Sequence, residues 1–270
     1  MRIDDVLFFD SETTGVILKG ADWELDYETF PHIVQLSWIH GCKVEDHIIL
    51  PEGWEIPVAA EQVHGITTGF AKAYGEPFAV VIDKFIKDCQ EAPLICGHNI
   101  YFDVSIVKAN ILRVLGRTYY DANDVDGALY KGKRIDTMRP AMKFVDARFA
   151  DGRLKLPRLG ELYAKCFPGE HFNAHNSLDD TKAVMRCLPV LVEAGIVELK
   201  VKEYPDKILD FSKQSEGKKP YTSESHRNGS NLSDNTQGDK LYNQQEKTPQ
   251  IANPEKITDI MDELLAQNEF

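Results

Sequence analysis

The sequence lacks three features that would assign it to other classes of protein. No run approaches the roughly 18 apolar residues of a membrane-spanning helix, and the acidic N-terminal segment lacks the layout of a signal peptide. The five cysteines lie far apart without a CxxC pair, which argues against zinc or a redox disulfide. We therefore expect a cytoplasmic protein, not associated with membranes, whose reduced cysteines pack mostly in the core.

An excess of positive charge is also missing. The 270 residues include 31 basic and 43 acidic side chains, a net charge of −12, which is the wrong sign for a protein that holds nucleic acid chiefly by neutralising phosphates. An enzyme whose acidic cleft holds divalent cations is compatible with this charge, because the cations then face the phosphate.

The order of the expected elements favours an α/β fold. Short apolar runs predict strands over 6–10, 33–39, 44–50 and 94–96, and a short fifth strand ending at Ile135. Helical spacing of apolar residues predicts helices over 78–86, 100–115, 159–167 and 178–194, with Pro77 in the first turn of its helix. These elements predict a sheet covered by helices on both sides. No regular element is predicted over 116–132.

The composition changes near Tyr204, where the chain becomes rich in Ser, Asn, Gln, Gly and Lys. We predict a catalytic domain over 1–203, a flexible low-complexity linker over 204–253 and an amphipathic helix over 254–270. In this last segment Ile257, Ile260, Met261, Leu264 and Leu265 recur at helical spacing. A helix on a tether is typical of a docking element, and packing of the helix against its own domain is the alternative.

The first of three polar clusters contains Asp10 and Glu12, at the end of a buried strand. The period of two in a strand aims both carboxylates in the same direction, while Ser11 points elsewhere. Two such acids repel each other unless a cation lies between them, and their oxygens suit Mg²⁺ or Mn²⁺. A solvated strand end would also explain this pair.

The second and third clusters lie at predicted helix starts. Asn99 suits the N-cap of one helix, and Asp103 lies in its first turn, where an acid also has a favourable structural role. Ser177 and Asp180 match the S-x-x-D capping pattern of another helix. Capping does not need His175, and histidine is a common general base near neutrality.

Together the clusters resemble the DEDDh, or DnaQ-like, family of 3′–5′ exonucleases. The stretch Asp10-Ser-Glu12-Thr-Thr-Gly15 is similar to the first motif of that family, His98-Asn99-x-x-Phe102-Asp103 to the second, and His175-x-x-x-x-Asp180 to the third. Residues 63–67 are similar to a substrate-contacting turn of members like the proofreading epsilon subunit of bacterial DNA polymerase III. The resemblance covers roughly residues 5–200 and implies a ribonuclease H-like mixed five-stranded sheet flanked by helices.

The resemblance also implies a mechanism and a binding site. Two Mg²⁺ or Mn²⁺ ions are held by Asp10, Glu12, Asp103 and Asp180, with His175 as the base. The implied contacts of the terminal nucleotide are Thr13, Thr14, Val63, His64, Ile66, Asn99 and Phe102. We prefer Asp180 to Asp179 as the fourth acid because of its five-residue offset from His175. The basic residues Lys131, Lys133, Arg134, Arg153, Lys155 and Arg158 are either the rim of the cleft or ordinary surface charges.

The expected function is the release of nucleoside monophosphates from 3′ ends of DNA, with single strands favoured, in proofreading or repair. A polymerase or another replication partner would bind the C-terminal helix. Two alternatives stay open: an RNA-trimming exoribonuclease, because the same five residues serve both substrates in the family, and a non-catalytic module that binds nucleic acid or a polymerase. A zinc or thiol hydrolase is disfavoured, because the chain has no suitable Cys or His cluster.

Overall fold

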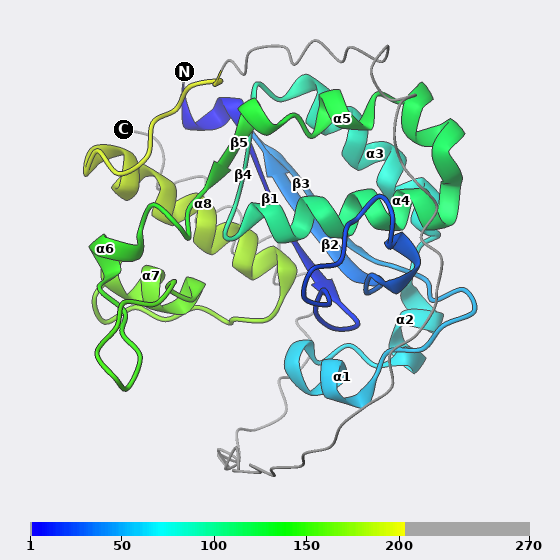
Figure 1. The fold of residues 1–270 in the computed structure, drawn as a ribbon, viewed down its shortest axis with the longest axis horizontal. Coiled ribbons are helices and arrows are strands. Elements are labelled where there is room, and N and C mark those ends of the chain that lie inside the picture. The colour runs from blue at the N-terminus through cyan, green and yellow to red at the C-terminus, as the bar shows by residue number, and fades with distance from the viewer. Residues whose placement is uncertain (1, 203–270) are drawn as a thin grey trace, which may run out of the picture. The chain divides into compact units, whose positions relative to one another are not determined.

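A mixed five-stranded sheet forms the centre of the described residues, 2–202, of the computed structural model (Figure 1). The strands are β1 (Val6–Thr13), β2 (Ile33–His40), β3 (Lys43–Ile48), β4 (Leu94–Gly97) and β5 (Arg134–Asp136). Their order is β3-β2-β1-β4-β5, with β1–β2 and β2–β3 antiparallel and β1–β4 and β4–β5 parallel. The predicted α/β class is confirmed. The predicted linker over 204–253 and the helix over 254–270 lie outside the described residues.

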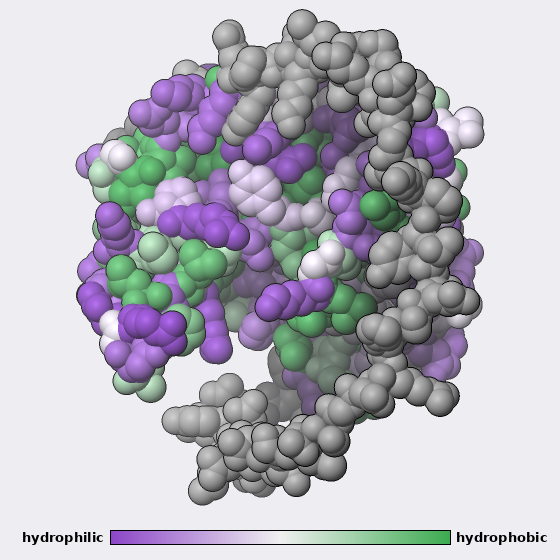
Figure 2. Space-filling model, in the orientation of Figure 1, coloured by the Kyte–Doolittle hydropathy of each residue, from purple (hydrophilic) through white to green (hydrophobic). Residues whose placement is uncertain are grey.

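Helices cover both faces of the sheet (Figure 1). The helices are α1 (Val58–His64), α2 (Thr68–Tyr74), α3 (Phe78–Glu91), α4 (Ile100–Ala122), α5 (Val125–Ala128), α6 (Met142–Val145), α7 (Leu159–Cys166) and α8 (Ser177–Glu193), with 3-10 turns at Ile3–Asp5, Tyr27–Thr29 and Lys131–Lys133. One core lies between the sheet and α3, α4 and α5, a second between the sheet and α7 and α8, and a smaller one beneath α1 and α2. None of the helices in the described part is long and apolar enough to cross a membrane. In Figure 2, hydrophobic side chains on the visible face form separate patches between hydrophilic ones.

The central strand β1 supplies both main cores through the pleat. Leu7 and Phe9 belong to the core beneath α3 and α4, whereas Val6 and Phe8 belong to the core beneath α7 and α8. All four side chains are at most 2% exposed, and burying each such side chain contributes about 1.5–3 kcal/mol. The burial of alternate residues on opposite faces fixes the directions of Asp10, Ser11 and Glu12, which follow in the strand.

Residues 116–132 contain helical structure, so the prediction of no regular element there is wrong. Helix α4 continues to Ala122 through a kink at Gly116, whose φ of 76° is accessible to glycine. The next helix, α5, is held by Tyr120, which is 2% exposed and donates its hydroxyl to Asp126 Oδ1 at 2.7 Å. A kink and a four-residue helix leave too little periodicity for a sequence pattern.

Other boundaries also differ from the sequence pattern. Helices α1 and α2, of seven residues each, are too short for the pattern to predict, since their apolar residues complete barely two turns. Pro77 is the N-cap of α3 and lies outside its first turn. The fifth strand, β5, is confirmed at Arg134–Asp136.

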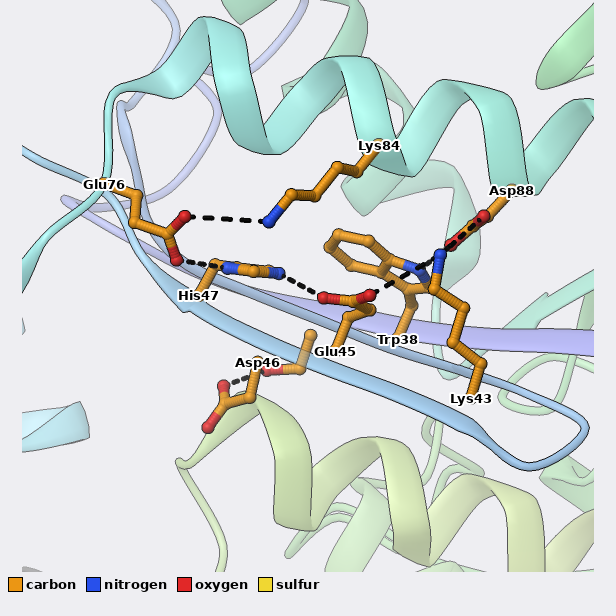
Figure 3. A network of polar contacts seen from close by, with 9 residues as sticks. Trp38, Lys43, Glu45, Asp46, His47, Glu76, Lys84 and Asp88 are labelled. Atoms are coloured by element: carbon orange, nitrogen blue, oxygen red, sulfur yellow. Dashed lines mark hydrogen bonds and ion pairs between the residues drawn. The ribbon is translucent and has the colours of Figure 1, made fainter. Parts of the chain in front are cut away.

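A buried carboxylate joins α3 to the sheet (Figure 3). Asp88 of α3, 8% exposed, accepts hydrogen bonds from Trp38 Nε1 at 2.6 Å and from Lys43 Nζ at 2.6 and 2.9 Å. The two donors come from β2 and β3, so one side chain connects three elements. The carboxylate lies at the end of a row of polar side chains between α3 and the face of the β2–β3 hairpin that α3 covers.

The same row continues through His47 (Figure 3). This imidazole is 7% exposed, with Nε2 2.7 Å from Glu45 Oε2 and Nδ1 2.6 Å from Glu76 Oε1. The hydrogen bond from His47 is the main cause that lowers the pKa of Glu76. The edge strand β3 is therefore tied to the start of α3 as well as to its end.

We predict that Asp88→Ala destabilises the protein by about 1–3 kcal/mol, because it leaves the indole N–H of Trp38 buried without an acceptor. Urea denaturation followed by tryptophan fluorescence measures the change. The matched control is Asp83→Ala on the same helix, whose carboxylate forms an exposed pair with Lys87 at 2.7 Å and should contribute less than about 1 kcal/mol. Equal losses in both variants would contradict the prediction.

Candidate active site

Two carboxylates lie on the same face of the sheet, at the carboxyl end of β1. Asp10 and Glu12 are half-buried and lie opposite Ser37 and Gln35 of β2. By the alternation of the strand they follow Val6 and Phe8 towards α8. The register shifts between Glu12 and Thr13, so the regular pairing with β2 is interrupted directly after the second acid.

A third carboxylate approaches from the opposite layer. Asp103, in the first turn of α4, is 3% exposed and accepts a hydrogen bond of 2.7 Å from Ser11 Oγ. Ser11 thus points to the α4 face, while its two acidic neighbours point to the α8 face. This hydrogen bond joins α4 to β1 between the two acids.

The fourth carboxylate and the histidine come from the start of α8. Asp180 lies in its first turn and accepts the backbone N–H of His175 at 3.1 Å. His175 is exposed and has a left-handed φ of 68°. Ligand atoms of Glu12, His175 and Asp180 all lie within 4.8 Å of one another, so these side chains could hold one cation.

The start of α8 is anchored to the sheet by Ser177. Its hydroxyl donates to the backbone oxygen of Asp10 at 2.6 Å, and its N–H donates to Gln35 Oε1 at 3.2 Å. The predicted capping role of Ser177 is wrong, because Asn176 is the N-cap and accepts the N–H of Asp179 at 3.2 Å. Ser177 instead joins the helix to the strand that carries the first acid.

Gln35 has no role in the sequence-based interpretation, and Ser177 appears there only as part of a capping pattern. Gln35 is 2% exposed and donates to Asp46 Oδ1 at 2.8 Å, which orients its oxygen towards Ser177. The available signal is the polar pair Gln35 and Ser37 within the apolar run of β2, since alternate positions share one face of the sheet. That signal does not say which helix start the pair contacts.

The four carboxylates oppose one another's ionisation. Burial is the main cause that raises the pKa of Asp10 well above its usual value, followed by the charges of Asp103, Asp180 and Glu12. Burial and the charge of Asp103 raise the pKa of Glu12 to about 7. Burial is also the main cause that raises the pKa values of Asp103 and Asp180 to about 7. A divalent cation would offset this repulsion, and an all-oxygen set suits Mg²⁺ or Mn²⁺.

Asp179, the neighbour of the fourth acid, has other contacts. It accepts hydrogen bonds from Lys182 Nζ at 3.2 Å and from Asn173 Nδ2 at 3.3 Å. Its carboxylate is thus paired with a cation of its own helix, whereas Asp180 faces Glu12 and His175.

The residues expected to contact the nucleotide lie on two sides of the acids. Next to β1, Thr14 Oγ1 accepts the N–H of His32 at 2.9 Å, and Thr13 Oγ1 donates to Gly15 O at 2.6 Å. Phe102 is half-buried beside Asp103 and packs against the core beneath α4. Asn99 is the N-cap of α4 with φ 68°, and its side chain makes no capping hydrogen bond; instead its N–H donates to Asp136 Oδ1 at 2.9 Å.

The end of α1 supplies the other expected contacts. Val63 is 53% exposed, and His64 Nδ1 accepts the N–H of Ile66 at 3.1 Å. Burial is the main cause that lowers the pKa of His64, and the charge of His175 lowers it further, so the end of α1 lies close to the loop before α8. Ile66, 7% exposed, is part of the small core beneath α1 and α2, which leaves little of its side chain for a ligand.

Most of the basic residues considered for the rim are engaged elsewhere. Lys133 Nζ donates to Cys89 O at 2.7 Å, Arg153 pairs with Asp151, and Lys155 pairs with Glu161. Arg158 is the N-cap residue of α7. Of the six, Arg134 lines a cavity.

His98 of the second motif has a structural contact on each ring nitrogen. Nε2 donates to Pro157 O at 2.9 Å, and Nδ1 lies 3.0 Å from Thr137 Oγ1. The ring therefore joins the end of β4 to the segments that follow β5 and precede α7.

Comparisons with known proteins identify the fold. No protein-family model and no curated protein sequence matches the chain. The structure is similar to that of Escherichia coli exonuclease I in complex with a dA16 oligonucleotide, with a TM-score of 0.51 and 21% identity over 70% of this chain and 42% of that chain. Exonuclease I from Methylocaldum szegediense has a TM-score of 0.51 and 18% identity over 70% of this chain and 40% of that chain. A product-bound exonuclease I has a TM-score of 0.50 and 19% identity over 71% of this chain and 44% of that chain. Residues 2–202 of this chain adopt a ribonuclease H-like fold.

The likeness concerns about two fifths of the length of each exonuclease I. At this level of identity it establishes the arrangement of strands and helices. The similarity to the epsilon subunit stays a prediction.

We predict that the metal-free protein loses stability as the pH rises from about 4 to about 7. The site carboxyls have raised pKa values in the fold, so the folded chain binds more protons than the unfolded chain in this range and deprotonation favours unfolding. Asp10→Asn should raise the melting temperature in chelator at about pH 8, by about 2–4 °C per kcal/mol of relieved repulsion. The gain should shrink at about pH 5, where the wild-type carboxyls are protonated.

Differential scanning fluorimetry at both pH values measures this difference, with Asp179→Asn as the control. Mn²⁺ should raise the melting temperature of the wild type at about pH 8 more than that of Asp10→Asn. The account is wrong if Asp10→Asn lowers the melting temperature in chelator at the higher pH.

Proposed function

We propose that the chain is a metal-dependent 3′–5′ exonuclease that releases nucleoside monophosphates from single-stranded DNA. The observation that carries the proposal is the convergence of four carboxylates and His175 at one end of β1, from three elements that are far apart in sequence. The ribonuclease H-like fold shared with exonuclease I adds support. Sets of acids that a cation would stabilise are a common basis of phosphodiester hydrolysis.

In the proposed mechanism, Asp10, Glu12, Asp103 and Asp180 would hold two Mg²⁺ or Mn²⁺ ions. Bound divalent ions supply stabilisation of the charge that develops on the attacking and leaving oxygens. The Ser11 hydroxyl holds Asp103 in place, and Ser177 holds the start of α8 against Asp10. Both hydroxyls keep acids from two helices close to β1 despite their repulsion.

His175 takes the proton of the attacking water. The water oxygen forms a bond to the terminal phosphorus as the bond to the 3′ oxygen of the preceding nucleotide breaks, and a solvent proton neutralises the leaving oxygen. The exposed position of His175, with its backbone held by Asp180, leaves the imidazole free to reach the water. Burial lowers the pKa of the nearby His64, which disfavours a second positive charge beside His175.

The terminal nucleotide lies between the end of β1 and the start of α4 on one side and the end of α1 on the other. Thr13, Thr14, Asn99 and Phe102 contact it from one side and Val63 and His64 from the other, where Ile66 offers only the small exposed part of its side chain. Exposed apolar and aromatic side chains suit bases of any sequence, because each base has a stacking face. We therefore expect cleavage with little sequence preference.

An RNA-trimming activity is the alternative within the same chemistry. A protein distinguishes RNA from DNA through the 2′-hydroxyl, and the carboxylates and His175 act on the phosphate in either substrate. A role in proofreading or repair, with a polymerase partner, depends on the C-terminal segment outside the described residues.

We predict that Asp10→Ala and His175→Ala each lower 3′-end degradation by at least about 100-fold, which is the lower range for loss of a general base. Chelation should abolish the activity, and Mg²⁺ or Mn²⁺ should restore it. Asp179→Ala is the matched control, since its carboxylate pairs with Lys182, and it should keep activity within about twofold of the wild type.

The measurement uses end-labelled single-stranded DNA, duplex DNA and RNA with product analysis by chromatography. Release of 5′-mononucleotides from the 3′ end is expected. Activity that survives chelation, or that is equal in His175→Ala and Asp179→Ala, would sink the mechanism. Faster degradation of RNA than of DNA would favour the alternative substrate.

A further inference from the structure

A cavity of about 320 Å³ lies along β5, all three residues of which line it, and beside the segment 195–202 that follows α8, outside the group of carboxylates. Four of its lining residues are basic: Arg134, Arg139, Lys200 and Lys202. We call this cavity the basic cleft. Its positive lining is notable in a chain of net charge −12, because the average surface of such a protein repels anions.

The two acids of the basic cleft do not cancel its positive charge. Asp136 accepts three backbone N–H groups, from Asn99 at 2.9 Å, Met138 at 3.0 Å and Arg139 at 3.2 Å. Glu198 forms an ion pair with Lys200. Four cations against these two carboxylates leave an excess of two positive charges.

Arg139 and Lys202 are the cations of the cleft with the greatest freedom. Both are exposed, and within residues 2–202 the Arg139 side chain has no hydrogen-bond acceptor. The N–H of Lys202 donates to Gly132 O at 2.8 Å, which holds its backbone next to the start of β5.

An aromatic ring lines the basic cleft next to one of its cations. Tyr101 is 38% exposed, lines the cleft and lies 5.8 Å, at its ring centroid, from the guanidinium of Arg134. It precedes Asp103 by two residues in α4. The start of α4 thus has the acid on one side and the basic cleft on the other, and Figure 1 shows this end of α4 beside β4 and β5.

We infer that the basic cleft binds the phosphodiester backbone of the single strand upstream of the terminal nucleotide, with a base stacked on Tyr101. A groove of cations with an adjacent aromatic ring is the usual means of holding single strands without sequence preference. This inference rests on the proposed function. It assigns binding of the strand to Arg139, Lys202 and Tyr101, and hydrolysis to the carboxylates.

The test measures binding apart from hydrolysis, with the full chain carrying Asp10→Asn. Fluorescence anisotropy follows labelled oligothymidylate and oligouridylate of about 12 nucleotides, a length within the usual site sizes, at several salt concentrations. The double variant Arg139→Gln/Lys202→Gln should bind both at least about tenfold more weakly, and the slope of log K against log salt should fall by about 0.7 for each lost phosphate contact. The control is Lys87→Gln on α3, whose ammonium pairs with Asp83 at 2.7 Å.

Tyr101 has its own pair of variants. Tyr101→Ala should weaken binding about tenfold through loss of stacking, and Tyr101→Phe should retain it, because the ring remains. If the slope of log K against log salt is unchanged in Tyr101→Ala, the lost affinity comes from stacking and not from phosphate contacts. A lower slope would overturn the assignment to stacking.

The inference is overturned if the double variant binds within about twofold of Lys87→Gln, or if the chain binds neither oligonucleotide. Tighter binding of a glutamate-rich peptide than of the oligonucleotides would also overturn it, in favour of an acidic protein partner. Hydrolysis is assayed separately on the chain that retains Asp10. Cleft-dependent binding without hydrolysis would refute the proposed function and leave this inference standing, whereas hydrolysis with cleft-independent binding would do the reverse.

Discussion

The repulsion among four carboxylates at the end of β1 is the constraint on which the rest of the site depends. Ionising each acid would cost less free energy in water than in the site, because burial and neighbouring charges raise all four pKa values. The hydroxyls of Ser11 and Ser177 and the backbone N–H of His175 hold the surrounding elements in place. A fold that keeps such a group together gives up stability, and a bound cation is the simplest compensation.

The pleat of one strand explains how three layers meet at this point. Val6, Phe8, Asp10 and Glu12 alternate with Leu7, Phe9 and Ser11, so the rule that builds two cores also separates the acids from the serine. Because Ser11 faces α4, it meets Asp103 there, and the acids of β1 meet α8 on the other side. The position of the site therefore follows from the same side-chain alternation that stabilises the sheet.

Sequence patterns predict the sheet and the long helices, and they single out the acids that the structure brings together, because apolar periodicity and motif spacing are local properties. They do not predict Gln35 and Ser177 as partners, since 142 positions separate these residues and the register of β2 decides their contact. Asn176 displaces Ser177 as the cap for a similar reason: tertiary contact with Asp10 uses the serine hydroxyl. The bend at Gly116 and the short α1 and α2 fall below the length at which periodicity is informative.

The left-handed backbone of His175 has a consequence for sequence variation. Non-glycine residues are uncommon in this conformation, and asparagine, aspartate and histidine are the ones that adopt it most often; the N–H at this residue also restrains Asp180. A replacement at this site therefore alters loop geometry together with the imidazole. Asparagine and glycine tolerate the backbone, so comparing them with alanine separates the part played by the ring from the part played by the shape of the loop.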